Sequence, residues 1–325
     1  TEDTMRREEA PFRFASSIAV CAIAVALSAC ESTATRADRS GVEEFRFGVM
    51  VMAHGGSDEW NARLMEAVEP LKVRFPVEVA LGMADAGSIE AAIGRLESQG
   101  VRQVGVVRVF ISGESWYDRT LQILGVQAGA PPRTDHDHSH AAGNRGMPMG
   151  FWRVDTELAF HVNVEGLADA AEMDEVLTDR IRVLSADPEN EVAAIIAHGS
   201  GDDAENQRWI EKITERTRDA QAELRLGDIR AFTLREDWPE KTIAAEREIR
   251  NYIMQANSQG LTPIVVPFRV QGFGPYERVL SELDYRADKL GLLPHRNVSR
   301  WIARQANLMR AQALDSHRVL TGDLP

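Results

Sequence analysis

Two histidines stand at the ends of apolar runs that match each other along the chain. Residues 49–56 read VMVMAHGG and residues 193–200 read AAIIAHGS, which places His54 and His198 144 positions apart, each inside Ala-His-Gly. An imidazole can ligate a divalent metal through one nitrogen or accept a proton near neutral pH. The alternative is a structural role, in which each ring caps a tight turn or bonds a carbonyl. Their matched settings favour a shared chemical site.

A second group of histidines lies in a segment rich in Gly, Pro and Ala, residues 128–150, which we interpret as an inserted loop. His136, His138 and His140 alternate with Asp135, Asp137 and Ser139. Alternate side chains of an extended segment point the same way, so the three imidazoles can close around one transition metal. The insert is predicted to capture or store metal with low selectivity; a solvated linker is the alternative.

Composition excludes several classes of protein. The chain has 325 residues, 44% of them apolar, which is enough for two domains with cores of their own. A net charge of −13 opposes binding to the phosphates of a nucleic acid, so we expect no nucleic-acid partner. The cysteines are Cys21 and Cys30, which leaves no thiols for a disulfide framework, a Cys zinc site or an iron–sulfur cluster in the globular part. We expect no organic cofactor.

The first 45 residues are typical of an export and anchoring segment. Arg6, Arg7 and Arg13 precede an uncharged apolar run over residues 14–29, shorter than the roughly 20 residues of a membrane span. The run ends in Leu-Ser-Ala-Cys30, which resembles a bacterial lipobox. We therefore predict a signal peptide over residues 1–29, lipidation of Cys30, and a polar tether over residues 30–45. The protein would face the periplasm and touch the membrane through its lipid; an ordinary signal peptide and an uncleaved anchor are the alternatives.

Beyond residue 45 the same order of elements occurs twice, as strand, helix, strand, helix, strand. Continuous apolar runs predict buried parallel strands, and their alternation with helices predicts right-handed crossovers. The fold class is α/β, with two doubly wound parallel-sheet domains related by internal duplication: residues 46–190, which include the insert, and residues 191–313, followed by a tail over 314–325. Strands are expected at 48–53, 77–81, 103–111, 192–197, 228–234 and 263–270, and helices at 58–74, 88–100, 204–224, 239–257, 276–290 and 297–313.

This layout assigns a place to the two Ala-His-Gly corners. Ligands of open α/β sheets bind beyond the carboxyl ends of the strands, where both corners fall. We therefore expect His54 and His198 to face one cleft between the two halves.

The corners and the order of the segments around them resemble the sirohydrochlorin chelatases, a family of class II tetrapyrrole chelatases. The resemblance rests on the strand that ends in His-Gly-Gly or His-Gly-Ser, on residues 77–81 and 88–93, and on Gln99-Gly100-Val101 followed by residues 106–111. It covers roughly residues 46–310 as a fused two-half form, and residues 174–184 look like the helix that closes the family's first half. It implies a chelatase fold and insertion of Co²⁺, Fe²⁺ or Ni²⁺ into a tetrapyrrole substrate.

The sequence departs from the family's pattern in the segment that follows the family's fourth strand. The family usually carries a segment like Pro-Leu-Phe-Leu-x-x-Gly-x-His there, but residues 108–116 end in Trp116 and residues 267–275 end in Pro275. Glu114 stands two positions from the missing histidine and is a candidate carboxylate ligand. An acidic residue often follows the family's second strand; Glu236 and Asp237 occupy that place in the second half, and Asp85 is displaced from it in the first.

The resemblance also implies roles for individual residues. Metal insertion removes two pyrrole N–H protons while the metal sheds water, which requires bases and exchangeable ligands. His198 would be the metal ligand or proton acceptor, with His54 opposite it and Glu114 or Glu236 as carboxylate help. The tetrapyrrole carries many carboxylates, which Arg108, Arg235 and Arg269 would bind; a solvated rim is the alternative for these arginines.

Three functions compete at this point. The first is a chelatase exported to the cell envelope, and the second is a chelatase-derived carrier of metal or tetrapyrrole that has lost its chemistry. A sugar or peptide receptor is supported by two α/β lobes alone. We expect a monomer, because two fused halves have less need to dimerise.

Overall fold

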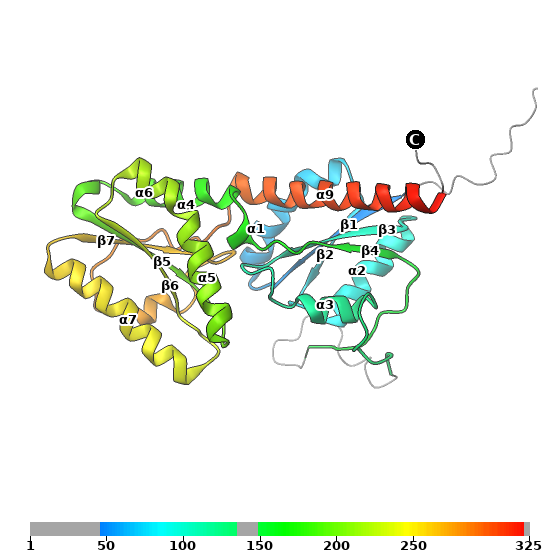
Figure 1. The fold of residues 1–325 in the computed structure, drawn as a ribbon, viewed down its shortest axis with the longest axis horizontal. Coiled ribbons are helices and arrows are strands. Elements are labelled where there is room, and N and C mark those ends of the chain that lie inside the picture. Colours follow the sequence, from blue (N-terminus) through cyan, green and yellow to red (C-terminus); the bar gives the residue numbers. More distant parts are fainter. Residues whose placement is uncertain (1–45, 135–148, 322–325) are drawn as a thin grey trace, which may run out of the picture. The chain divides into compact units, whose positions relative to one another are not determined.

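The computed structural model of the chain describes residues 46–134 and 149–321, which contain two fully parallel β-sheets (Figure 1). The first sheet has the strand order β2-β1-β3-β4 and the second the order β6-β5-β7. In both, the first strand of a half pairs with the next two strands of that half. The strands are β1 Phe47–Ala53, β2 Val77–Leu81, β3 Gln103–Val109, β4 Ala159–Val162, β5 Glu191–Ala197, β6 Asp228–Thr233 and β7 Thr262–Pro267.

Helices cover both faces of each sheet. Every residue of β1 is buried: Val49 and Val51 enter one hydrophobic core, and Met50 and Met52 enter another on the opposite face. This explains the continuous apolar runs and confirms the predicted fold class of doubly wound parallel sheets. The helices are α1 Asp58–Val68, α2 Ala86–Ser98, α3 Tyr117–Ile123, α4 Glu172–Leu184, α5 Asp203–Arg216, α6 Arg218–Leu224, α7 Pro239–Ser258, α8 Tyr276–Val279 and α9 Arg296–Thr321.

One apolar core is shared by the two halves. The cluster that contains Val49 and Val51 of β1 also contains Ala193 and Ile195 of β5 and, from α9, Trp301. The opposite faces of the two sheets have separate cores, under α2 and α7 respectively. Burial of apolar surface therefore holds the two halves together as well as each half alone.

The division of the chain at residue 190 is not a division in space. We expected α4 to close the first half, yet it packs against α5, α6 and β7 of the second. In return, α9 packs against β1, β3, β4 and α1 of the first half (Figure 1). Gly105 of β3 permits this contact, because a Cβ there would lie 2.7 Å from Phe47 Cζ and 3.3 Å from Met309 Cβ. Each half thus covers part of the other half's sheet.

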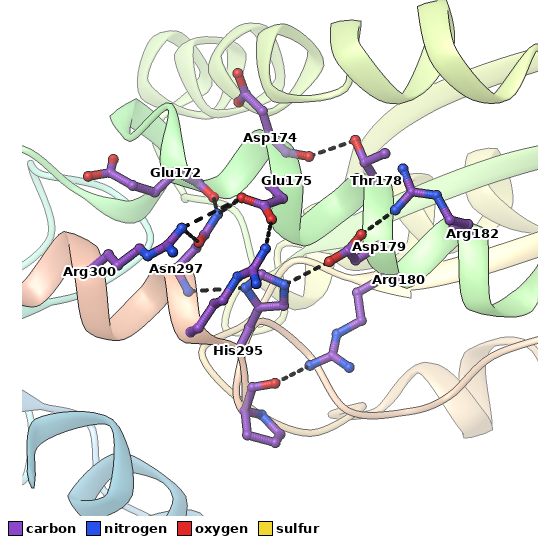
Figure 2. Close-up of polar contacts among 12 residues, drawn as sticks. Glu172, Asp174, Glu175, Thr178, Asp179, Arg180, Arg182, His295, Asn297 and Arg300 are labelled. Atoms are coloured by element: carbon purple, nitrogen blue, oxygen red, sulfur yellow. Dashed lines mark hydrogen bonds and ion pairs between the residues drawn. The ribbon is translucent and has the colours of Figure 1, made fainter. Parts of the chain in front are cut away.

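A polar junction fixes the start of α9 on α4 (Figure 2). The side-chain amide of Asn297 donates to the Glu172 carbonyl over 3.0 Å and to Glu175 Oε2 over 2.7 Å. His295 Nδ1 accepts the backbone N–H of Asn297 at 3.1 Å, so its proton belongs on Nε2, which lies 3.2 Å from Asp179 Oδ2. His295 is therefore used to orient α9, outside the cleft chemistry.

The expected helix over residues 276–290 is wrong after its first turn. The structure has α8 over Tyr276–Val279, and the chain then turns, with Glu282 in the left-handed region at φ 66°. Arg286 lies beside β7, where its carbonyl accepts the N–H of Val265 at 2.8 Å. The Arg286 carbonyl, which in a helix would accept a hydrogen bond from within that helix, therefore accepts one from the edge strand β7.

Smaller differences concern element ends. The helix expected over 204–224 is divided at Thr217, and α9 continues beyond residue 313 into the predicted tail.

We did not predict β4, a strand of four residues whose burial is incomplete and which pairs with β3. Short, half-exposed strands carry little apolar signal.

Substitution of Trp301 tests whether the packing of α9 stabilises the shared core. Its ring is fully buried and its indole N–H donates to Glu165 Oε1 over 2.8 Å. Trp301→Ala should lower the free energy of unfolding by about 3–5 kcal/mol, measured by urea denaturation. The control, Leu308→Ala, removes a side chain that is 49% exposed on the same helix, and it should cost less than about 1 kcal/mol. Equal effects would contradict this packing of α9.

Candidate functional site

A cavity of about 640 Å³ opens at the carboxyl ends of the central strands of both sheets. His54, directly after β1, and His198, directly after β5, both line it. The structure therefore brings the two predicted histidines to one cavity, at the position that α/β sheets use for ligands. Their chemical roles stay predictions. The wall consists of His54, Gly55, Trp60, Met83, Val109, Phe110, Ile111, Glu114, Ser115, Trp116, His198, Gly199, Ser200, Glu205, Trp209, Asp237, Trp238, Arg269, Val270, Gln271 and Gly274.

The two histidines are held in the same way. Nδ1 of His54 lies 2.6 Å from the Gly55 carbonyl oxygen, and Nδ1 of His198 lies 2.9 Å from that of Gly199. A carbonyl accepts only, so each Nδ1 carries a proton and donates it. Nε2 is then the nitrogen of each ring that faces away from its own turn and can serve a metal or a proton.

Each corner is also tied to the helix that follows it. Asn61 Oδ1 accepts the N–H of Gly56 at 3.0 Å, and Asn206 Oδ1 accepts the N–H of Ser200 at 3.1 Å. Both asparagines are the fourth residue of their helices, α1 and α5. We missed this feature, although an asparagine seven or eight residues after each Ala-His-Gly histidine was a readable signal.

The second corner has a carboxylate beside its histidine. His198 Nε2 lies 3.2 Å from Asp237 Oδ2, and the His198 ring packs edge-on against Trp238 with centroids 6.1 Å apart. Two ligands at about 2.1 Å from one metal and at right angles are about 3 Å apart. His198 and Asp237 therefore have the spacing of adjacent ligands of one cation.

At the first corner, within residues 46–134 and 149–321, no carboxylate is paired with His54 in this way. Asp85, which follows β2 as Asp237 follows β6, accepts the N–H of Ser88 at 2.8 Å and that of Gly150 at 2.7 Å. It thereby caps α2 and anchors the last residue of the insert. Met83 lines the cavity on this side instead. The two halves are alike in backbone and different in chemistry.

The two predicted glutamates are engaged with arginines. Glu114 lines the cavity, and both its oxygens accept from Arg208, at 2.9 and 2.5 Å. This hydrogen bond lowers the pKa of Glu114 below its usual range. Glu236 pairs with Arg269 and is absent from the lining. Neither carboxylate is placed beside an imidazole by a contact of the kind that joins His198 to Asp237.

Arg108 does not take the role that we expected. Its side chain is buried with 1% exposure, and its guanidinium donates to the carbonyls of Gly113 and Ser115 and lies over the Tyr117 ring at 4.7 Å. Burial lowers its pKa to about 10, so it stays charged at neutral pH. The interpretation as a substrate-binding residue is wrong, because the guanidinium is used to shape the loop before α3.

Arg235 is likewise structural. It donates to the carbonyl of Ser200 at 2.7 Å and to that of Gly201 at 2.9 Å, and it pairs with Asp203 at 2.6 Å. Its guanidinium therefore braces the loop after His198, which corrects its predicted substrate role. Arg269 does line the cavity, as predicted for a substrate-binding residue, although it is paired with Glu236.

The cavity has an aromatic wall, which we did not predict. Trp116 stands where the resemblance placed a histidine, with its backbone in the left-handed region at φ 59° and its side chain 36% exposed. Such a backbone costs about 1–2 kcal/mol for a non-glycine residue and is concentrated at functional sites. Four of the chain's six tryptophans line this cavity: Trp60, Trp116, Trp209 and Trp238. Trp60 and Trp209 follow the corner histidines by 6 and 11 residues, which was a readable signal, whereas Trp116 and Trp238 stand 62 and 40 residues after them.

Some predicted residues lie outside the described part of the chain, namely Cys30, His136, His138 and His140. Over residues 46–134 and 149–321, no group of three His, Cys, Asp or Glu side chains has the arrangement of a metal site. In the same ranges, no helix combines the length and the apolar character needed to cross a bilayer.

Comparison with known proteins gives a structural likeness and no sequence match. No family model and no curated protein matches the chain. SirB from Bacillus subtilis with Fe³⁺ superposes with a TM-score of 0.56 at 14% identity, over 84% of this chain and 97% of that one. The sirohydrochlorin chelatase SirB from Bacillus subtilis subspecies spizizenii in complex with cobalt gives 0.51 at 12% identity, over 81% and 95%. The chain thus has a chelatase-like fold.

Substitution of Gly199 tests whether the backbone of the second corner is sterically crowded. Its φ is 85°, and a Cβ would lie 2.7 Å from both Asn206 Oδ1 and Thr233 Cβ. Gly260 has a similar φ of 76° with open space around it. Gly260→Ala should cost about 1–2 kcal/mol of unfolding free energy from the backbone alone, and Gly199→Ala about 1–3 kcal/mol more from the clash. Thermal denaturation of both variants measures the difference; equal losses would show that the corner is not crowded.

Proposed function

We propose that the cavity binds a tetrapyrrole and that the protein inserts a divalent first-row metal, Co²⁺, Fe²⁺ or Ni²⁺, into it. The observation that carries this proposal is the pairing of His198 Nε2 with Asp237 Oδ2 at 3.2 Å in the wall of a cavity that His54 also lines. One imidazole and one carboxylate hold such metals while leaving most coordination positions open. The chelatase-like fold supports the same assignment.

In this proposal the two corners have different tasks. His198 and Asp237 would hold the metal through two protein ligands, weak enough for the metal to leave for four pyrrole nitrogens. Two pyrrole N–H protons must depart as the metal enters. Nε2 of His54, on the wall contributed by the first half, is free to accept one of them, and solvent takes the other.

The tryptophans suit a flat apolar ligand. Indole rings present broad faces that stack on conjugated rings, and they give up little conformational entropy when they do so. The Trp209 indole is fixed by a hydrogen bond to Glu205 Oε1 at 3.2 Å, and Glu205 Oε2 accepts from Ser200 Oγ at 2.7 Å. The aromatic wall is therefore connected to the His198 corner.

A second candidate is binding of the same ligands without insertion. Two observations favour it: Trp116 stands where the resemblance placed a histidine, and the described residues contain no convergent set of three metal-ligating side chains. Several expectations remain predictions beside either candidate: export to the periplasm, the lipid on Cys30, the monomeric state, and metal capture by His136, His138 and His140.

An absorbance assay of the full chain separates the candidates, and substitution of His198 tests the role of the second corner. With sirohydrochlorin and Co²⁺ the full chain should give a progressive absorbance change over many turnovers. His198→Ala should lower the rate by at least about 100-fold, because it removes a metal ligand or base. His161→Gln is the matched control, since His161 lies on β4, bonds Gln103 and is absent from the cavity wall.

The outcomes are distinct. A stoichiometric absorbance change without turnover would support the carrier and contradict the enzyme. Absence of any change with sirohydrochlorin would contradict both candidates, and full activity of His198→Ala would overturn the role of the second corner.

A further inference from the structure

A bidentate ion pair crosses between the two halves at the cavity. Arg208 of α5 donates through Nε to Glu114 Oε1 over 2.9 Å and through Nη2 to Oε2 over 2.5 Å. Glu114 belongs to the loop that leads from β3 to α3, and it lines the cavity. The guanidinium of one half thus holds a carboxylate of the other at the wall of the site.

Arg208 is absent from the cavity wall and lies on the face of α5 that contributes to it. Glu205, Arg208, Trp209 and Lys212 are spaced three and four residues apart, which puts them on one face of the helix. Glu205 and Trp209 line the cavity. A macrocycle stacked beside Trp209 would therefore bring its peripheral substituents to Arg208.

The Arg208–Glu114 ion pair is exposed enough for another carboxylate to replace Glu114. Both side chains are 44% exposed, and ion pairs of this exposure contribute little net stability. A guanidinium fork accepts any carboxylate of the same shape, so a ligand carboxylate can replace Glu114 with little loss of interaction energy. By contrast, Arg108 and Arg235 are bound to backbone carbonyls inside the fold.

The charge of the chain makes such a group necessary. With a net charge of −13, the protein repels anionic ligands unless cations stand at the site. Lys212, one turn beyond Arg208, is already paired with Asp169 at 2.7 Å, and Asp169 is absent from the cavity wall.

We propose that Arg208 is the receptor for a carboxylate substituent of the ligand, and that Glu114 occupies it as an internal substitute until the ligand displaces it. This proposal rests on the proposed function and adds a specificity-determining residue to it. It also gives Glu114 a role other than metal ligation: Glu114 competes with the substrate. Ligands that lack carboxylates would leave the pair closed and gain nothing from Arg208.

The test is a binding titration of the full chain, followed by quenching of tryptophan fluorescence. The probes are uroporphyrin, which carries eight carboxylates, and the cationic tetrakis(N-methylpyridyl)porphyrin, which carries none. Arg208→Gln should weaken uroporphyrin binding roughly tenfold, the loss of one charge-assisted pair. Glu114→Gln should tighten it about three- to tenfold, because the competitor is gone. Neither variant should strengthen or weaken binding of the cationic porphyrin more than about twofold.

Lys212→Gln is the control for a bracing role. It removes the same charge from the same face of α5 and breaks the ion pair with Asp169, and we expect less than about a twofold effect on uroporphyrin. Weaker uroporphyrin binding by Glu114→Gln, or equal losses in Arg208→Gln and Lys212→Gln, would show a brace and overturn the proposal. Binding of uroporphyrin by the wild type with no effect of Arg208→Gln would overturn it while leaving the proposed function intact. No binding of either porphyrin by the wild type would contradict both.

Discussion

The shared apolar core is the constraint on which the site depends. Because α4 packs against the second half and α9 against the first, neither half can move without exposing apolar surface of both. The carboxyl ends of β1 and β5 are thereby held at one cavity. The function proposed for this cavity depends on the shared core, because reacting groups that come from two halves must keep a fixed relative position.

The two corners show how one backbone pattern serves two purposes. In both, a left-handed glycine follows the histidine and an asparagine of the next helix holds the turn. The second corner adds Asp237 beside His198, whereas in the first the corresponding Asp85 caps α2. The two corners are therefore alike in backbone, and they differ in what the neighbouring aspartate contacts.

Much of the fold could be predicted from the sequence, because buried parallel strands leave continuous apolar runs and the Ala-His-Gly corners repeat. The exchange of α4 and α9 could not, since both helices have one apolar face and nothing local states which sheet it covers. Two of the three predicted arginines were misassigned for a similar reason. Arg108 and Arg235 have long side chains whose partners are backbone carbonyls of nearby loops, and only the folded loop shows that those carbonyls are within reach.

The central claim is that the second corner holds the metal inside the shared cavity. Anomalous diffraction at the cobalt edge from crystals of the full chain soaked in Co²⁺ tests it most directly. We predict a peak within about 2.0–2.2 Å of both His198 Nε2 and Asp237 Oδ2, in the cavity that His54 also lines. Cobalt bound elsewhere with nothing at His198, or a cavity filled by side chains from either half, would contradict the account.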